Sequence, residues 1–283
     1  MNRLLIGLKR HKLLSLAVVA IVVVASVAIF APFVAPYSPD VQFPNGISDM
    51  GSPLPPNHTF PLGTDLLGRD LLSRMIYGAR TSLIVGVVAN FIAVFIGTSL
   101  GLVAGFSRGI LGNAIMRFTD LMLAFPALIL AIALAAILRP SLWIVILVIA
   151  LVNWTWVCRV IYTQTTALIE REYIEAVRSL GASPMRIMVR HLIPHLVPTI
   201  IVWGTLGIAT AVQLEATLSF LGVGVQPPTP SWGNIIFENQ SYFSTAPWLV
   251  LTPGLAIIVL ALSFNVIGDA LREMVDPTRK GRT

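Results

Sequence analysis

The chain has 283 residues, of which 56% are hydrophobic and 11% are charged, and its formal net charge is +6. Soluble domains carry about 25% charged residues, so this composition excludes a soluble globular protein, a disordered chain and a coiled coil. We therefore expect an all-α, polytopic membrane protein. The single cysteine, Cys158, excludes an internal disulfide and is predicted to be a packing residue.

Six segments are long and apolar enough to cross a bilayer, which takes about 20 residues per helix. The predicted spans are residues 13–35, 81–107, 121–138, 140–158, 196–214 (continuing past Glu215) and 248–268. The apolar run of the first span exceeds the core of a cleaved signal peptide, so we expect a retained anchor.

The distribution of basic residues predicts the orientation of these spans. With an even number of spans, both termini lie on one side of the membrane. If that side is the cytoplasm, 15 of the 19 Lys and Arg residues lie inside and four lie outside. The positive-inside rule therefore predicts an N-in, C-in topology.

A long extracytoplasmic loop is predicted between the first two spans. Its first part, up to residue 57, is rich in proline, which favours an extended, irregular segment. In its second part, 58–80, Asp65 and Asp70 precede Arg69 and Arg74 by four residues each, the favourable order for ion pairs on a helix. Leucines between them complete an apolar face, so we expect a short amphipathic helix near the membrane surface. The alternative is a solvated charged linker.

A second outer loop, near residues 221–247, is rich in Pro, Gly and aromatic residues. We expect its aromatic side chains to lie at the membrane interface. The alternative is a loop that enters a translocation path or meets a partner protein. The residues concerned are Trp232, Tyr242, Phe243 and Trp248.

The second span carries small residues at intervals of four, a spacing that lets another helix approach closely. They are Ala89, Ala93, Gly97, Gly101 and Gly105. We expect this stripe to be a helix-packing surface.

Two polar residues, Gln213 and Glu215, lie within the fifth apolar stretch. An intramembrane carboxylate is costly and points by default to function. We expect these two residues to line a polar translocation path. Glu215 has two alternatives, pairing with a partner subunit and solvation near the outer surface.

The longest cytoplasmic segment, residues 159–197, has a polar helix–turn–helix pattern. Residues 164–180 predict a helix, which Gly181 breaks, and Ser183 and Pro184 are suited to start the next one. An apolar stripe and a basic ridge then lie side by side, and two prolines are expected to end this second helix before the fifth span. The stripe is Met185, Met188, Val189 and Leu192, the ridge is Arg186 and Arg190, and the prolines are Pro194 and Pro198. Such an element either lies on the membrane or docks into a groove of a soluble partner.

This segment resembles the EAA loop of ATP-binding-cassette (ABC) importer permeases. Glu175-Ala176-Val177 is followed by Gly181 and later by Ile193-Pro194. Three further motifs, PLGTDLLGRDLLSRMIYGARTSL, LEATLSFLGVGVQPPTPSWG and GDALREMVDPTRK, are similar to those of the C-type subunits of dipeptide, oligopeptide and nickel permeases.

The resemblance implies a permease subunit of an ATP-driven, binding-protein-dependent importer in a bacterial or archaeal plasma membrane, with di- or oligopeptides as the expected cargo. It implies a B-type permease subunit, two ATPase subunits and an extracytoplasmic substrate-binding protein as partners. It also implies a five-helix core in residues 81–283, preceded by an anchor and outer loop in 1–80. No cofactor is expected on this chain, since it lacks the phosphate loop GxxxxGK[ST]; ATP and Mg²⁺ would be bound by the partners.

The same resemblance implies that residues 159–197, here named the coupling loop, connect the permease to its ATPase. Two groups of residues are expected to carry this role. Glu175, Ala176 and Gly181 shape the loop, and Met185, Arg186, Met188, Val189 and Arg190 form the docking face. No catalytic or metal-binding residue is expected.

Three alternatives remain open from the sequence. The cargo of such an importer can instead be a nickel chelate, an opine or glutathione. A secondary transporter should show internal repeats, and no clear repeat is found. A membrane-embedded enzyme needs clustered ligands, whereas His191 and His195, although four residues apart, have no neighbouring carboxylate cluster.

Overall fold

The computed structural model describes residues 12–107, 109–138 and 141–275, and this part of the chain is helical, with three isolated β-bridges and no strand. Several predictions fall outside it: much of the basic N-terminal segment, Arg108, Arg139 and the last part of the GDALREMVDPTRK motif. Five helices are long and apolar enough to cross a membrane, and a bent pair raises the number to six if it counts as one crossing.

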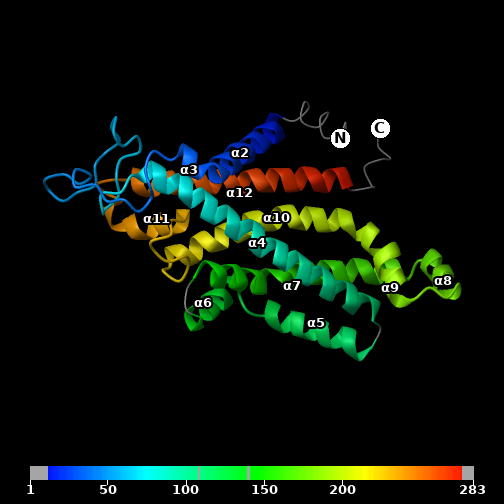
Figure 1. The fold of residues 1–283 in the computed structure, drawn as a ribbon. Helices are drawn as coiled ribbons and strands as arrows, with labels where there is room; N and C mark the ends of the chain where they lie inside the picture. The colour runs from blue at the N-terminus through cyan, green and yellow to red at the C-terminus, as the bar shows by residue number, and fades with distance from the viewer. Residues whose placement is uncertain (1–11, 108, 139–140, 276–283) are drawn as a thin grey trace.

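The first described helix is α2, Lys12–Ile29, followed by the short α3, Ala31–Val34. The predicted first span is thus interrupted at Phe30, and Pro32 lies in the first turn of α3. Helix α2 packs on α12, Trp248–Val275, and on α4, Leu71–Phe106. It therefore lies on one flank of the bundle, as Figure 1 shows.

Helix α4 is longer than the predicted second span because it begins ten residues earlier. The Asp70 carboxylate caps it by accepting from the Ser73 amide at 2.8 Å. Its 36 residues correspond to about 54 Å, well beyond the hydrocarbon thickness of a bilayer. Helix α4 packs most extensively on α7, Leu142–Ile169, and also on α10, Ile193–Phe220.

The prediction of one continuous third span over residues 121–138 is wrong. Helix α5, Ile110–Leu123, and helix α6, Ala127–Ile137, are bent by 90° at the intervening break. Pro126 is the last residue of the break; it has no amide hydrogen, and proline disfavours helical geometry in the residue before it. The 11 residues of α6 span only about 16 Å, too short to cross alone.

The predicted amphipathic helix within residues 58–80 is also corrected. Residues 58–70 form turns, with Gly63 and Gly68 at φ +80° and +73°, and only the residues from Leu71 onward are helical. The predicted Asp65–Arg69 ion pair exists, with Arg69 Nε 2.6 Å from Asp65 Oδ2, but it is buried within these turns. The proline-rich part of the loop is irregular, as predicted.

Two predictions for the coupling loop are wrong. The expected helix over 164–180 is broken, because α7 continues to Ile169 and a separate helix α8, Glu172–Ser179, follows. After α9, Pro184–Ile187, a π-helical turn, Met188–Leu192, leads directly into α10. Pro194 and Pro198 therefore do not end a helix. Pro194 lies in the first turn of α10, directly after the widened π turn, where a proline's missing amide is readily tolerated.

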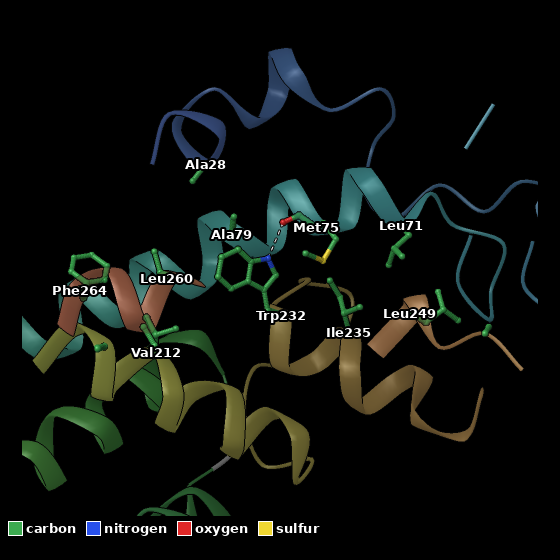
Figure 2. Close-up of a cluster of buried hydrophobic side chains, with 13 residues drawn as sticks. Ala28, Leu71, Met75, Ala79, Val212, Trp232, Ile235, Leu249, Leu260 and Phe264 are labelled. Atoms are coloured by element: carbon green, nitrogen blue, oxygen red, sulfur yellow. Dashed lines mark hydrogen bonds between the residues drawn. The ribbon is translucent and has the colours of Figure 1, made fainter. Parts of the chain in front are cut away.

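A buried apolar cluster lies between α4, α10, α12 and the short helix α11, Trp232–Asn239. Figure 2 shows Trp232 at its centre, with Nε1 donating to the Met75 carbonyl at 3.1 Å. Trp232 is 2% exposed, so its predicted interfacial position is wrong. A 3₁₀ turn, Gln240–Tyr242, connects α11 toward α12.

Candidate functional site: the coupling loop and the α7–α10 trough

The coupling loop lies at one end of the molecule, opposite the outer loop and α11 (Figure 1). Helix α8 ends in a tight turn in which Gly181 has φ +80°, a conformation that L side chains rarely adopt. The hydroxyl of Ser183 then accepts from the Arg186 amide at 3.4 Å and starts α9. The predicted break and cap are therefore both confirmed.

Buried side chains attach this loop firmly to the transmembrane helices. Ile174 of α8, Ile187 of α9 and Leu192 of the π turn are each at most 1% exposed. They pack in one cluster with Ile161 and Ile169 of α7. The loop is therefore packed directly against α7 and, through Leu196, against α10.

The residues predicted for docking lie mostly on the surface. Met185 is 65% exposed and Val189 is 48% exposed. Arg186 and Arg190 are exposed, Met188 is half-buried, and Leu192 belongs to the interior. Glu175, Ala176 and Gly181 are also exposed.

Sequence reasoning missed two features of this surface. Leu180, beside the Gly181 turn, is 87% exposed, whereas leucine is among the residues most often buried. Its position just before the glycine is the only local signal. The buried Ile174 and Ile187 were also missed, since each is the single buried residue of a short helix and gives little local signal.

The small-residue stripe of α4 packs on α7. A Cβ added at Gly97 would lie 2.6 Å from the Trp154 carbonyl oxygen, and one at Gly101 would lie 2.5 Å from the Cys158 carbonyl oxygen. At Gly105 the same atom would lie 2.7 Å from Thr165 Cβ. The helices can approach this closely only without side chains at these positions.

Two adjoining cavities form a trough along α7 and α10. The first, of about 420 Å³, has apolar walls with neutral polar side chains, among them Asn90, Asn153, Thr210, Gln213 and Thr217. The second, of about 720 Å³, extends toward the coupling loop and contains Arg171, His195 and Arg272. Trp203 and Leu206 line both cavities, so the two cavities are neighbours along α7 and α10.

The structure separates the two residues that were predicted together for a polar path. Gln213 is exposed and lines the first cavity. Glu215 is fully buried on another side of α10, where its oxygens accept from Ser82 Oγ at 3.0 Å and Ser219 Oγ at 2.8 Å. Glu215 thus joins α10 to α4, and it does not belong to the lining of either cavity.

A buried ion-pair cluster holds the outer loop and α11 on the bundle. Glu238 Oε2 accepts from Arg69 Nη2 at 2.6 Å and from Arg74 Nη2 at 2.7 Å. Asp65 lies beside both arginines, 2.6 Å from Arg69 Nε and 3.4 Å from Arg74 Nε. The sequence pattern contained three of these residues, but it did not single out Glu238.

Among the described residues no group of three or more His, Cys, Asp and Glu side chains could hold a metal ion. His195 Nδ1 lies 2.8 Å from the His191 carbonyl oxygen, a contact within one helical turn.

Comparison with known proteins identifies the family. Residues 97–281 match the binding-protein-dependent transport system inner membrane component, and residues 3–56 match the N-terminal TM domain of oligopeptide transport permease C.

Individual relatives agree with this assignment. The di/tripeptide transport system permease protein DppC of Pseudomonas aeruginosa is 43% identical, covering 89% of this chain and 84% of its own. The dipeptide permease protein DppC of Alkalihalophilus pseudofirmus is 41% identical (96% and 88%), and the glutathione permease protein GsiD of Escherichia coli is 40% identical (96% and 89%).

Solved structures show the same fold. Two inward-facing crystal forms of the MetNI methionine ABC transporter contain a chain that matches with TM-scores of 0.59 and 0.57 at 20% and 21% identity. The matches cover 73% and 71% of this chain and 98% and 96% of that chain.

These matches show a multi-pass protein of the bacterial inner membrane, which works with a partner permease, ATPase subunits and a binding protein and does not itself hydrolyse ATP. The chain belongs to the binding-protein-dependent transport system inner membrane components, the permease family of ABC importers.

Proposed function

We propose that the chain is the C-type permease of a peptide importer and forms the translocation path together with a B-type permease subunit. The relatives named for dipeptide, di/tripeptide and glutathione transport support a short peptide as cargo. Nickel chelates and opines remain alternatives within the family. No feature of the described residues favours a secondary transporter.

The observation that carries the mechanism is the attachment of the coupling loop. The loop exposes apolar and basic side chains, of which Leu180, Met185 and Val189 are the main apolar ones. Beneath them the fully buried isoleucines of the loop pack on the transmembrane helices. Such a surface fits a groove on a soluble ATPase subunit. Binding of ATP by those subunits, which would hold the nucleotide and Mg²⁺, would move the loop and with it α7 and α10.

The α7–α10 trough is the proposed contribution of this chain to the path. The first cavity of the trough contains amide and hydroxyl groups, including the amide of Gln213. These groups can form hydrogen bonds with the backbone of any peptide. Peptides of different sequence share that backbone. Glu215 is proposed to fix α10 against α4 beside the path.

We also propose six crossings with both termini in the cytoplasm, α5 and α6 counting as one. The division into residues 1–80 and 81–283 is kept as a proposal, supported by the separate family match to residues 3–56, with its boundary inside α4.

The docking proposal is tested in the complete complex reconstituted in liposomes. Met185→Glu and Glu175→Lys should each reduce the binding-protein- and peptide-stimulated ATPase rate several-fold and weaken co-purification of the ATPase subunits. Met50→Glu is the control, since Met50 is 94% exposed in the outer loop. Normal stimulation in both coupling-loop variants would overturn the docking assignment.

The topology is tested by cysteine labelling in a Cys158→Ser background, because Cys158 is the chain's only cysteine. In intact spheroplasts a membrane-impermeant maleimide should label Met50→Cys and leave Leu180→Cys unlabelled until the membrane is opened. The reverse pattern would contradict the proposed orientation.

A further inference from the structure

The two halves of the α7–α10 trough differ in charge. The first cavity is lined by neutral residues only, whereas the second is lined by Arg171, His195 and Arg272 and by no carboxylate. Acidic residues next to the arginines in sequence, such as Glu170 and Glu273, are not part of this lining. The end of the trough beside the coupling loop is therefore selectively basic.

The three basic side chains come from three elements that are distant in sequence. Arg171 lies just after α7, His195 in the first turn of α10, and Arg272 in the last turn of α12. The remaining lining between them includes Gln164 and Thr199, whose hydroxyl donates to the glutamine oxygen at 2.9 Å. The fold thus gathers cationic and polar groups around one opening.

We propose that Arg171, His195 and Arg272 form a site that binds the C-terminal carboxylate of a peptide as it leaves the trough. This inference rests on the proposed function and adds a binding site to it. Every peptide with a free C-terminus carries this carboxylate whatever its side chains, and guanidinium groups match its geometry.

The site also has a reason to lie beyond Trp203 and Leu206, on the side nearer the coupling loop. Trp203 and Leu206, which line both cavities, would have to be passed by a charged group with little compensation. A membrane potential that is negative inside further opposes inward movement of an anion. Positive charge on the side of Trp203 and Leu206 nearer the coupling loop offsets the cost of desolvation and the cost of moving against the membrane potential.

The test uses the nucleotide-free complex in nanodiscs. The binding protein is left out, so that any preference between ligands comes from the two permease subunits. Binding of trialanine and of trialanine amide is compared by saturation-transfer NMR. We expect the free acid to bind about fivefold more tightly than the amide, because a ratio of this size is typical of exposed ion pairs. The double variant Arg171→Gln/Arg272→Gln should abolish this preference, and the double lysine variant should retain most of it.

Arg117→Gln is the matched control, since Arg117 is an exposed arginine of α5 outside both cavities. Equal binding of acid and amide to the wild-type complex would overturn the inference, as would an acid preference that survives the double glutamine substitution. Loss of co-purified anionic phospholipid in that variant, without change in peptide binding, would assign the site to lipid instead.

Failure of the proposed function gives a different result. It would appear as absence of binding-protein-dependent uptake of any peptide by the wild-type complex. Uptake of trialanine together with equal binding of acid and amide would leave the importer assignment intact and remove only the carboxylate site.

Discussion

Arg74, in the first turn of α4, donates to Glu238 of α11 across 2.7 Å, although the two residues are 164 positions apart in the sequence. The same carboxylate oxygen accepts from Arg69. One acidic side chain thus joins the outer loop, the start of α4 and the helix before α12 in a site where Arg69 and Arg74 are nearly inaccessible to water.

Glu238→Gln should therefore destabilise the protein strongly. The substitution removes the negative charge that both buried guanidinium groups share and leaves them in ion-pair contact with Asp65, and breaking a buried ion pair in this way costs about 3–5 kcal/mol. We expect a clear decrease in the thermal unfolding midpoint of the detergent-purified complex. Asp49→Asn, in the exposed part of the same loop, is the control, and equal midpoints for the two variants would contradict the structural role of Glu238.

The glycine stripe predicts a second set of stability changes. Gly101→Ala would place a Cβ 2.5 Å from the Cys158 carbonyl oxygen, a backbone atom that cannot move aside without separating α4 from α7. Such overpacking costs about 1–3 kcal/mol. We expect a lower unfolding midpoint, measured by tryptophan fluorescence.

Gly254→Ala supplies the matched comparison for Gly101→Ala. Gly254 lies inside α12, with no atom within 4 Å of an added Cβ. Because alanine favours helix by up to about 1 kcal/mol over glycine, this variant should be as stable as the wild type or more so. A destabilised Gly254→Ala with an unaffected Gly101→Ala would contradict the packing of α4 on α7.

The glycine stripe, the Gly181 turn and the Ser183 cap were predictable because their signals are local. A spacing of four residues, or a serine before a proline, carries its meaning within one or two helical turns. The apolar content of the spans is equally local, and five of the six predicted spans correspond to long apolar helices.

Features that depend on distant residues were not predictable. Nothing in the sequence around Glu238 indicates that it contacts Arg69 and Arg74. Nothing around Glu215 indicates that it accepts a hydrogen bond from Ser82, 133 positions away. The spacing of Asp65 and Arg69 suggested a helix, but the carboxylate instead accepts from the backbone amides of Leu67 and Arg69, each at 2.9 Å, within a turn. The bend between α5 and α6 was overlooked because apolar content outweighed the signal of Pro126.

Gly181→Val should uncouple the transporter without unfolding it. Gly181 has φ +80° and no atom within 4 Å of an added Cβ, so the substitution introduces backbone strain of about 1–2 kcal/mol and no steric clash. The turn between α8 and α9 would change shape. We expect normal membrane insertion and a several-fold lower peptide-stimulated ATPase rate.

Gly51→Val is a close control for this experiment. Gly51 has φ +75° and is equally open, but it belongs to the loop between α3 and α4. That loop lies at the end of the molecule opposite α8 and α9 (Figure 1). Its variant carries comparable local strain and should retain stimulated ATPase activity. Similar loss of stimulation in both variants would show that strain alone, rather than the position of the turn, causes the defect.

Gln213 and Glu215 should respond differently to the same substitution. Glu215→Leu removes the acceptor for Ser82 and Ser219 in a fully buried site, and each hydroxyl left unsatisfied costs about 1–3 kcal/mol. Gln213→Leu affects an exposed side chain that lines the first cavity. We therefore expect Glu215→Leu to lower the unfolding midpoint, and Gln213→Leu to leave that midpoint unchanged while reducing trialanine uptake. Glu215→Gln should recover much of the lost stability, because its amide oxygen can accept from one serine and its NH2 group can donate to the hydroxyl oxygen of the other. A stable Glu215→Leu variant with impaired uptake would instead favour a direct role of Glu215 in the path.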